Sequence, residues 1–463
     1  MTTDSNSLLQ QIEKVVGKAG LLRGDQLTGR SAGIWSGREL EALALVRPVS
    51  TAEVSAVMKL CHAARQVVVP AGGMTGLAGG HNSGSADIVL STERLNRIES
   101  LDTHSRCMTV QAGAILQTVQ EAAADAGLMF ALDLGARASC TIGGNIATNA
   151  GGVRVLRFGM MREQVLGLEA VLADGSIVSS MFSVLKNNAG YDLRQMFLGS
   201  EGTLGIVTRA ILRLHEAPLA VETALLAVPS WGQVMGLLRY FDAALPGVLV
   251  AYEVLWRDFY RLNTGPHSSV EAPLDTDEPY YVLLDVFISD SERGREKLET
   301  LLMAILDKGD ISDGVLASSE AERARFWQIR ENFEPEQNCY DKIYGYDVSL
   351  PLEAMETYVD GVRAALLQRF ADAALFAYGH IGDGNLHFSI YPGEWREREV
   401  IDEIVYHPLR ALHGSVSAEH GIGVEKKAYL GYTRSSAEIE LMRNTRRMMD
   451  PYNILNPGKI FDF

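Results

Sequence analysis

Cysteine, long apolar runs and basic charge are all scarce in this 463-residue chain. The four cysteines, Cys61, Cys107, Cys140 and Cys339, have no spacing typical of a metal knuckle or redox pair, so we expect reduced core thiols of an intracellular protein. No apolar run approaches the roughly 20 residues of a membrane span. The formal net charge of −16 argues against nucleic-acid binding. We predict a cytoplasmic protein with no transmembrane segment and no nucleic-acid partner.

The chain is too long for one ordinary core, and its composition, 47% apolar and 22% charged, is that of a globular protein. Residues 1–218 alternate short apolar strands, helical stretches and glycine-rich loops. After residue 218, apolar strands alternate with longer helical stretches, which predicts an antiparallel sheet with helices on one face. The fold class expected is α+β, and the predicted domains are 1–218, 219–405 and a C-terminal helical segment, 406–463, that returns to the first domain.

Three glycine-rich stretches lie in the first predicted domain, at residues 72–80, 135–152 and 199–207. Glycine lets backbone N–H groups approach a phosphate closely and permits positive φ. No G-x-G-x-x-G or Walker A pattern occurs, and any one stretch alone is as easily explained by a tight turn. Three of them together favour a large dinucleotide that lies along several loops.

A second set of motifs lies near the C-terminal end. His380 and His387 flank a Gly-Asp-Gly-Asn turn, and Glu419 and His420 stand beside glycines. Two imidazoles and a carboxylate can hold a divalent metal ion with one position left open, so we predict His380, His387 and Glu419 as ligands. His420 would then serve as general base for an alcohol, or would only orient a ligand. The alternative is a hairpin with two surface histidines.

The segments 70–80, 142–152 and 199–207 closely resemble the FAD-binding segments of the vanillyl-alcohol-oxidase superfamily. The late histidine and glutamate motifs resemble those of its FAD-linked D-2-hydroxyacid dehydrogenases, and residues 133–140 and 191–193 are most similar to the D-2-hydroxyglutarate branch. The resemblance runs from about residue 40 to Lys459. It implies a PCMH-type FAD-binding domain and a cap of the FAD-linked oxidase C-terminal type.

The resemblance also implies which residues bind FAD. No histidine matches the covalent flavin attachments of the family, and His81, after the first glycine loop, is not expected to reach the flavin ring, so non-covalent FAD is expected. The implied cofactor-binding residues are Pro70, Gly72, Gly73, Met74, Thr75, Gly76, Leu77, Gly80, Gly135, Ser139, Gly143, Gly144, Asn145, Thr148, Gly151, Gly202, Ile206 and Asn456.

By the same resemblance Arg330 binds the substrate carboxylate, and the metal is Zn²⁺ or Mn²⁺. Without it, Arg330 would be interpreted as a helix-surface arginine paired with a glutamate. The implied reaction is metal-assisted oxidation of a D-2-hydroxyacid to the 2-oxoacid, with D-2-hydroxyglutarate, D-malate or D-lactate as candidate substrates. Electrons would pass to an electron-transfer flavoprotein or a quinone, and a homodimer is possible. The alternatives are a metal-free FAD oxidase of alcohols or sugars and a subunit of a glycolate-oxidase-like complex.

Three positions depart from the hydroxyglutarate pattern. Gly345 stands where a lysine is usual, Glu334 replaces a threonine, and Ser389 replaces an asparagine. The loss of a cation and the gain of an anion disfavour a second substrate carboxylate. Lys342 could restore the positive charge if its loop folded back.

Overall fold

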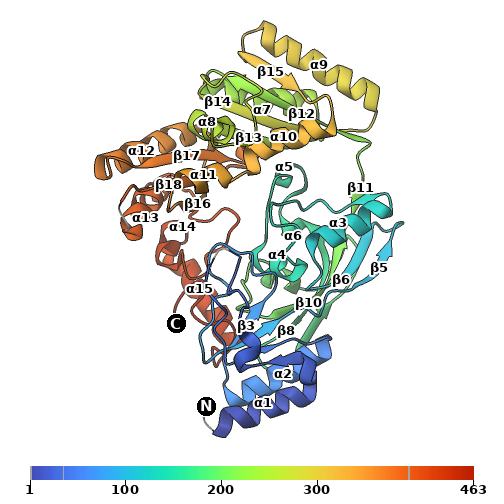
Figure 1. The fold of residues 1–463 in the computed structure, drawn as a ribbon. Helices are drawn as coiled ribbons and strands as arrows, with labels where there is room; N and C mark the ends of the chain where they lie inside the picture. The colour runs from blue at the N-terminus through green and yellow to red at the C-terminus, as the bar shows by residue number, and fades with distance from the viewer. Residues whose placement is uncertain (1–2, 35, 395–396) are drawn as a thin grey trace. The chain divides into compact units, whose positions relative to one another are not determined.

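The computed structural model describes residues 3–34, 36–394 and 397–463, which form two compact units (Figure 1). The first unit combines Met1–Gly151, Gly159–Ala217 and Glu419–Phe463, and the second combines Gly152–Phe158 with Pro218–Ala418. The chain thus passes between the units after Gly151, Phe158, Ala217 and Ala418, whereas the predicted divisions lie after residues 218 and 405. In the part of the chain described, no helix is both long and apolar enough to span a bilayer.

The first unit begins with a small sheet backed by two helices. The sheet has the order β1 (Leu21–Leu22), β2 (Ala44–Val46), β4 (Ile88–Ser91), β3 (Val68–Ala71), and its last three strands are parallel. The helices are α1 (Thr3–Val16) and α2 (Thr51–Ala64). Their apolar side chains, such as Ile12 and Val57, pack into one core with Val68 and Leu90 of the strands.

A second, antiparallel sheet completes the unit, with the order β5 (Ile98–Asp102), β6 (Cys107–Gln111), β10 (Ile206–Arg213), β8 (Val165–Val171), β9 (Ile177–Ser180). Helices α3 (Leu116–Asp125) and α4 (Ile142–Thr148) share its core through Val119 and Ile146, which lie with Val110 and Leu168. The remaining elements are the strand pair β7 (Leu128–Met129) and β11 (His215–Glu216), and α6 (Met161–Gln164).

The C-terminal segment, with α14 (Leu430–Thr433) and α15 (Ser436–Met449), belongs to this unit. Leu455 pairs in parallel with Val68 of β3. The buried Asn456 amide donates to the carbonyl oxygens of Gly80, at 3.0 Å, and Glu201, at 2.7 Å. The last residues therefore tie two of the glycine-rich loops together.

The second unit is built on one seven-stranded antiparallel sheet (Figure 1). Its order is β15 (Asp313–Leu316), β12 (Ala220–Val228), β14 (Tyr280–Ile288), β13 (Leu249–Trp256), β17 (Ala374–Gly379), β18 (Asn385–Tyr391), β16 (Tyr344–Ser349). Its helices are α5 (Val155–Phe158), α7 (Trp231–Ala244), α8 (Arg257–Thr264), α9 (Ser291–Asp307), α10 (Glu320–Glu331), α11 (Glu334–Cys339), α12 (Met355–Arg369) and α13 (Arg398–Tyr406).

Helices cover both faces of this sheet, so the expectation of helices on one face is wrong. Phe259 of α8 and Ile329 of α10 pack with Leu255 of β13 in one core. On the opposite face, Tyr358 of α12 stacks on Phe388 of β18. The predicted α+β class with an antiparallel sheet is confirmed, although β15 and β18 were not among the predicted strands.

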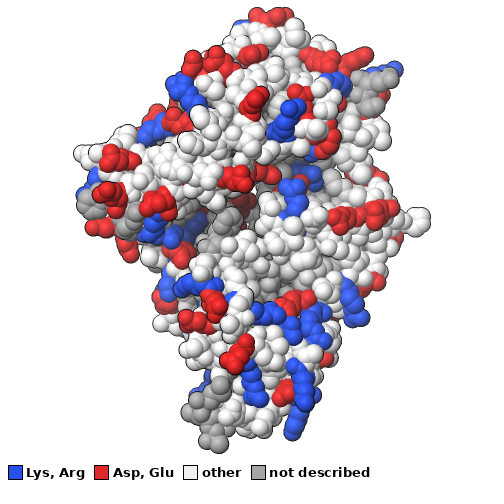
Figure 2. Space-filling view, viewed as in Figure 1, with Lys and Arg blue, Asp and Glu red and all other residues white. Residues whose placement is uncertain are grey.

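On the surface seen in Figure 2, acidic and basic side chains are interspersed.

Candidate active site

The polar groups of the second unit share one face of its sheet. Alternate residues of a strand point to the same face. Asp347 of β16 pairs with His387 of β18, and His387 pairs with Tyr378 of β17. Tyr378 in turn pairs with Leu255 of β13, and Glu253 is two positions before Leu255 on the same face. Four adjacent strands thus place a carboxylate, an imidazole and a second carboxylate side by side.

Glu253 is the fully buried centre of this group. Its carboxylate accepts a hydrogen bond from Arg330 Nε at 2.9 Å and one from His380 Nδ1 at 2.6 Å. Burial opposes ionisation of Glu253, but the charges of His380 and Arg330 outweigh it and hold the pKa of this carboxyl below its usual range. Sequence reasoning missed Glu253, because an acidic residue inside an apolar strand carries no motif of its own.

The two histidines converge through the turn between β17 and β18. Gly384 adopts φ 85°, a left-handed conformation that favours glycine, and the chain then reverses into β18. The rings of His380 and His387 lie edge to face with centroids 5.2 Å apart. Both side chains are buried, which contradicts the alternative of two surface histidines. Since Nδ1 of His380 is paired with Glu253, a metal ion held by this ring would bind at Nε2.

A second carboxylate, Asp347, fixes the segment that leads to Glu419. It is fully buried and accepts hydrogen bonds from the Ser417 hydroxyl, at 3.3 Å, and from the Ala418 N–H, at 3.1 Å. Ala418 is joined directly to Glu419 in the chain. Asp347 therefore restrains the backbone that carries the predicted carboxylate ligand.

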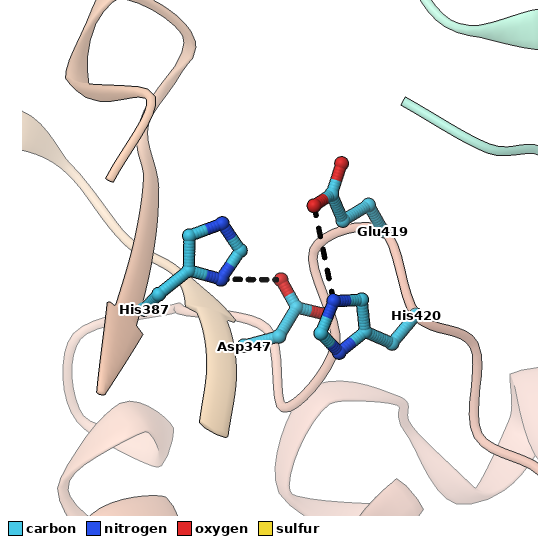
Figure 3. Close-up of side chains that lie close together, drawn as sticks. All are labelled: Asp347, His387, Glu419 and His420. Carbon is cyan, nitrogen blue, oxygen red and sulfur yellow. Dashed lines mark ion pairs between the residues drawn. The ribbon is translucent and has the colours of Figure 1, made fainter. Parts of the chain in front are cut away.

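Figure 3 shows four side chains with donor atoms that could bind a metal ion: Asp347, His387, Glu419 and His420. Within the second unit, Asp347 Oδ1 lies 3.9 Å from His387 Nδ1, and within the first, Glu419 Oε1 lies 3.8 Å from His420 Nε2. The predicted ligand set shares His387 and Glu419 with this group. His380 stays a predicted ligand, and Asp347 is a candidate that sequence reasoning did not include.

Arg330 is a buried arginine, so the surface interpretation is wrong. It lies in the last turn of α10, and its guanidinium carbon stands 4.5 Å from the centre of the Tyr378 ring while Nε binds Glu253. This combined stacking and ion pairing fixes the orientation of the planar guanidinium. Its role in carboxylate binding stays a prediction.

The three departures from the hydroxyglutarate pattern separate in space. Gly345 pairs directly with Ser389 on the face of the sheet that carries Asp347 and His387. Glu334, the first residue of α11, is exposed, and the buried acid of this helix is Glu336. Burial raises the pKa of Glu336 to about 7, although a hydrogen bond to Ser389 and the charge of Arg330 oppose the shift.

Lys342 does not restore a charge beside Gly345. Its ammonium lies 5.0 Å from the centre of the Tyr344 ring. Tyr344 and Gly345 are consecutive in β16, so their side-chain positions are on opposite faces of the sheet.

The glycine-rich loops of the first unit line a cavity. Thirteen of the predicted cofactor-binding residues are among its lining residues: Pro70, Gly72, Gly73, Met74, Thr75, Gly76, Gly80, Gly143, Gly144, Asn145, Thr148, Gly202 and Ile206. The predicted residues that do not line it are Leu77, Gly135, Ser139, Gly151 and Asn456. Asn456 joins two of the loops through its hydrogen bonds to the carbonyl oxygens of Gly80 and Glu201, and its contact with the cofactor stays a prediction.

The cavity also contains residues that were not predicted to bind the cofactor. Thr141 caps the N-terminus of α4 by accepting a hydrogen bond from Gly144, and a threonine before a glycine-rich helix start was a readable signal. Glu201 accepts the N–H groups of Ile422 and Gly423, both at 2.7 Å. His420, the predicted base, lines the same cavity, as does His81.

The donor chemistry of this cavity fits FAD. Eight of its 24 lining residues are glycines, whose backbone N–H groups, with the hydroxyl groups of Thr75, Thr141 and Thr148, can act as donors to a diphosphate. Small residues also leave room for a long ligand to lie close to the backbone. The cavity therefore fits a dinucleotide that is bound along several loops.

The comparisons with known families agree with this assignment. Residues 42–180 match the family described as "FAD binding domain", and residues 217–460 match "FAD linked oxidases, C-terminal domain". Among solved structures, the fold is similar to 4-ethylphenol oxidase from Gulosibacter chungangensis, with a TM-score of 0.75 over 100% of this chain and 98% of that one, at 16% identity. An alkyldihydroxyacetonephosphate synthase gives a TM-score of 0.76 over 97% of this chain and 84% of that one, also at 16% identity. The two family matches show that the chain has the domains of the FAD-linked oxidase type.

Curated relatives narrow the class. A D-2-hydroxyglutarate dehydrogenase of Xanthomonas citri pv. viticola is 39% identical, over 91% of this chain and 89% of the relative. The mitochondrial D-2-hydroxyglutarate dehydrogenase of Bos taurus is 38% identical over 90% and 76%. A mitochondrial protein of Schizosaccharomyces pombe named as a D-lactate dehydrogenase is 36% identical over 89% and 81%. The chain belongs to the family of FAD-linked D-2-hydroxyacid dehydrogenases.

Replacement of Gly73 should weaken FAD binding. A methyl group there would lie 2.1 Å from the Ser139 carbonyl oxygen, so Gly73→Ala must displace the loop. We expect about tenfold weaker binding, the equivalent of about 1.4 kcal/mol, in a titration of apoprotein with FAD. Gly236→Ala in α7, where a methyl meets no described atom within 4 Å, is the matched control. Unchanged affinity in Gly73→Ala would contradict the loop geometry.

Removal of the Glu253 carboxylate should destabilise the protein. Glu253→Ala leaves the buried Arg330 without its partner, and breaking a buried ion pair costs about 3–5 kcal/mol. Glu299→Ala, which removes an exposed pair with Arg295, should cost less than about 1 kcal/mol. Denaturant unfolding of both variants measures the difference. Equal losses of unfolding free energy in the two variants would show that the buried Glu253 ion pair contributes no more to stability than the exposed pair.

Proposed function

We propose that this protein oxidises a D-2-hydroxyacid to the 2-oxoacid with the help of a divalent metal ion. The observation that carries the proposal is the buried network in which Glu253 holds both Arg330 and His380 beside His387. A cation, two imidazoles and nearby carboxylates match the two ends of a 2-hydroxyacid, which has a carboxylate and an adjacent hydroxyl. Several relatives are named for such substrates, and D-2-hydroxyglutarate, D-malate and D-lactate are the candidates.

Arg330 binds the substrate carboxylate in this proposal. The Nε–H of Arg330 donates its hydrogen bond to Glu253. Among residues 3–34, 36–394 and 397–463 the guanidinium makes no other hydrogen bond. Its two Nη groups therefore remain for a carboxylate, with the geometry suited to two parallel hydrogen bonds. The Tyr378 ring beneath it keeps the plane from turning.

His380, His387 and Glu419 hold the metal ion. The hydrogen bond to Glu253 fixes the tautomer of His380, and Asp347 fixes the backbone next to Glu419. Two nitrogen donors and one carboxylate oxygen suit Zn²⁺ or Mn²⁺. When bound, such an ion supplies Lewis acidity that lowers the pKa of a coordinated hydroxyl group.

His420 accepts the proton of the substrate hydroxyl at a ring nitrogen. It follows the proposed ligand Glu419 directly and lines the FAD cavity of the first unit. An imidazole that is neutral near pH 7 is suited to this transfer. When bound, FAD supplies the acceptor for the hydride from C2, so the alcohol loses two electrons and two hydrogens in all.

In this proposal the electron acceptor is an electron-transfer flavoprotein or a quinone, and the protein forms a homodimer in the cytoplasm. The bacterial relative from Xanthomonas citri fits the cytoplasmic assignment, whereas several eukaryotic relatives are named as mitochondrial.

Replacement of the base should stop the reaction and leave the cofactor in place. We expect His420→Asn to reduce its flavin at least 100-fold more slowly with a D-2-hydroxyacid, because general-base catalysis contributes about 10²–10⁴-fold. Stopped-flow bleaching of the oxidised flavin under anaerobic conditions measures the rate, and the visible spectrum measures FAD content. His413→Asn, at an exposed position with φ 53°, is the control. Fast bleaching in His420→Asn would refute the assignment.

Removal of the metal should have a separate signature. Dialysis against a chelator is expected to abolish flavin reduction by hydroxyacids without loss of FAD, and Zn²⁺ or Mn²⁺ should restore it. His387→Ala should retain less than about a tenth of the wild-type metal by elemental analysis, since a ligand is lost. Full activity in metal-free protein, with peroxide formed at each turnover, would instead favour a metal-free oxidase. Activity that appears only with an added partner would favour a subunit of a larger complex.

A further inference from the structure

One buried carboxyl group has no part in the reaction proposed above. Glu336 of α11 is 4% exposed, and its Oε1 has no hydrogen-bond partner within the described residues. A buried polar atom left unpaired is costly. Such an atom beside a candidate active site requires an explanation, and a hydroxyl group of a bound substrate would supply its partner.

The position of Glu336 relates it to the substrate. Its carboxyl group forms a hydrogen bond with Ser389 and lies within the electrostatic reach of Arg330, the proposed carboxylate binder. Ser389 is two positions beyond His387 in β18, on the same face of the sheet. Two residues of a strand span roughly 7 Å, a distance that a hydroxyl on C4 of an acid held near His387 can cover with its hydrogen bond, whereas a hydroxyl on C3 cannot.

Gly345 supplies room at this place. It pairs with Ser389 across β16 and β18, and a methyl group added to it would meet no described atom within 4 Å. The hydroxyglutarate pattern has a lysine here, which could neutralise a second substrate carboxylate. A dicarboxylate would instead bring its distal group toward an acid, with Lys342 on the opposite face.

We propose that Glu336 and Ser389 form a subsite for a hydroxyl group on the substrate side chain, so that the preferred substrates are D-2-hydroxyacids with one carboxylate and a second hydroxyl. The inference rests on the proposed function. The side-chain hydroxyl donates a hydrogen bond to Glu336 Oε1 and thereby satisfies the unpaired atom. Burial raises the pKa of Glu336, which agrees with a subsite that takes a neutral group in place of an anion.

A panel of matched acids tests the subsite. D-2,4-dihydroxybutyrate, D-2-hydroxybutyrate and D-malate have the same carbon number and differ only at C4. D-glycerate and D-lactate form a control pair, because a C3 hydroxyl is too close to C2 to reach the subsite, and D-2-hydroxyglutarate completes the panel. We expect kcat/KM for anaerobic flavin reduction to be at least about tenfold higher with D-2,4-dihydroxybutyrate than with D-2-hydroxybutyrate, because a site built to bind a hydroxyl rejects the analogue that lacks it. The dicarboxylates should be the poorest substrates.

Two variants assign the preference to Glu336. Glu336→Leu should reduce the hydroxyl preference to less than about twofold, while Glu334→Leu, at the exposed neighbouring acid, should leave it unchanged. The wild-type panel decides independently if Glu336→Leu fails to fold or to retain FAD. Best activity with D-malate or D-2-hydroxyglutarate, or an intact preference in Glu336→Leu, overturns the subsite and leaves the proposed function standing. If no acid bleaches the flavin of a metal-loaded enzyme, the proposed function fails as well.

Discussion

The buried carboxylate of Glu253 holds together the groups from which the candidate site is built. It binds an arginine from a helix and a histidine from a hairpin, two elements that are distant in sequence. Burial of a charge is tolerated only when partners compensate it, and here two partners do so. Neither partner can turn without leaving the carboxylate unsatisfied, so each presents its remaining nitrogen atoms in a fixed direction.

The two faces of the seven-stranded sheet carry different kinds of side chain. One face carries the acids, the imidazole of His387 and the glycine opposite Ser389, and the other carries aromatic residues such as Tyr346 and Phe388 that pack beneath α12 and α13. This division follows from the two-residue period of a strand. It explains how a site with several charged groups can stand on a sheet whose strands are almost wholly buried.

Features that depend on a short stretch of chain were the most predictable. The glycine loops around Gly72 and Gly143 have a backbone conformation set by their own residues, and they line the cavity. The turn between His380 and His387 is equally local, and it brings the two imidazole rings together. Glu253 could not be found in this way, because its importance arises from residues that approach it from other strands and helices.

The helix start at α11 shows a related limit. The hydroxyglutarate pattern drew attention to Glu334, but the helical turn exposes this residue and buries Glu336 two positions later. Likewise, the hydrogen bonds from Asn456 to the carbonyl oxygens of Gly80 and Glu201 could not be read from the sequence, and its predicted contact with the cofactor stays a prediction. Only the three-dimensional packing decides which atom faces which neighbour.

The connectivity of the two units has a consequence for the synthesis of the protein. The first unit is assembled from three separate segments, and its third, Glu419–Phe463, contains the residues that pair with β3 and brace the glycine loops. A ribosome that has completed the first 217 residues has therefore not yet made a complete first unit. The second unit, by contrast, is finished before those last residues emerge. The cofactor-binding unit, although its synthesis starts first, is therefore the last to have all of its residues.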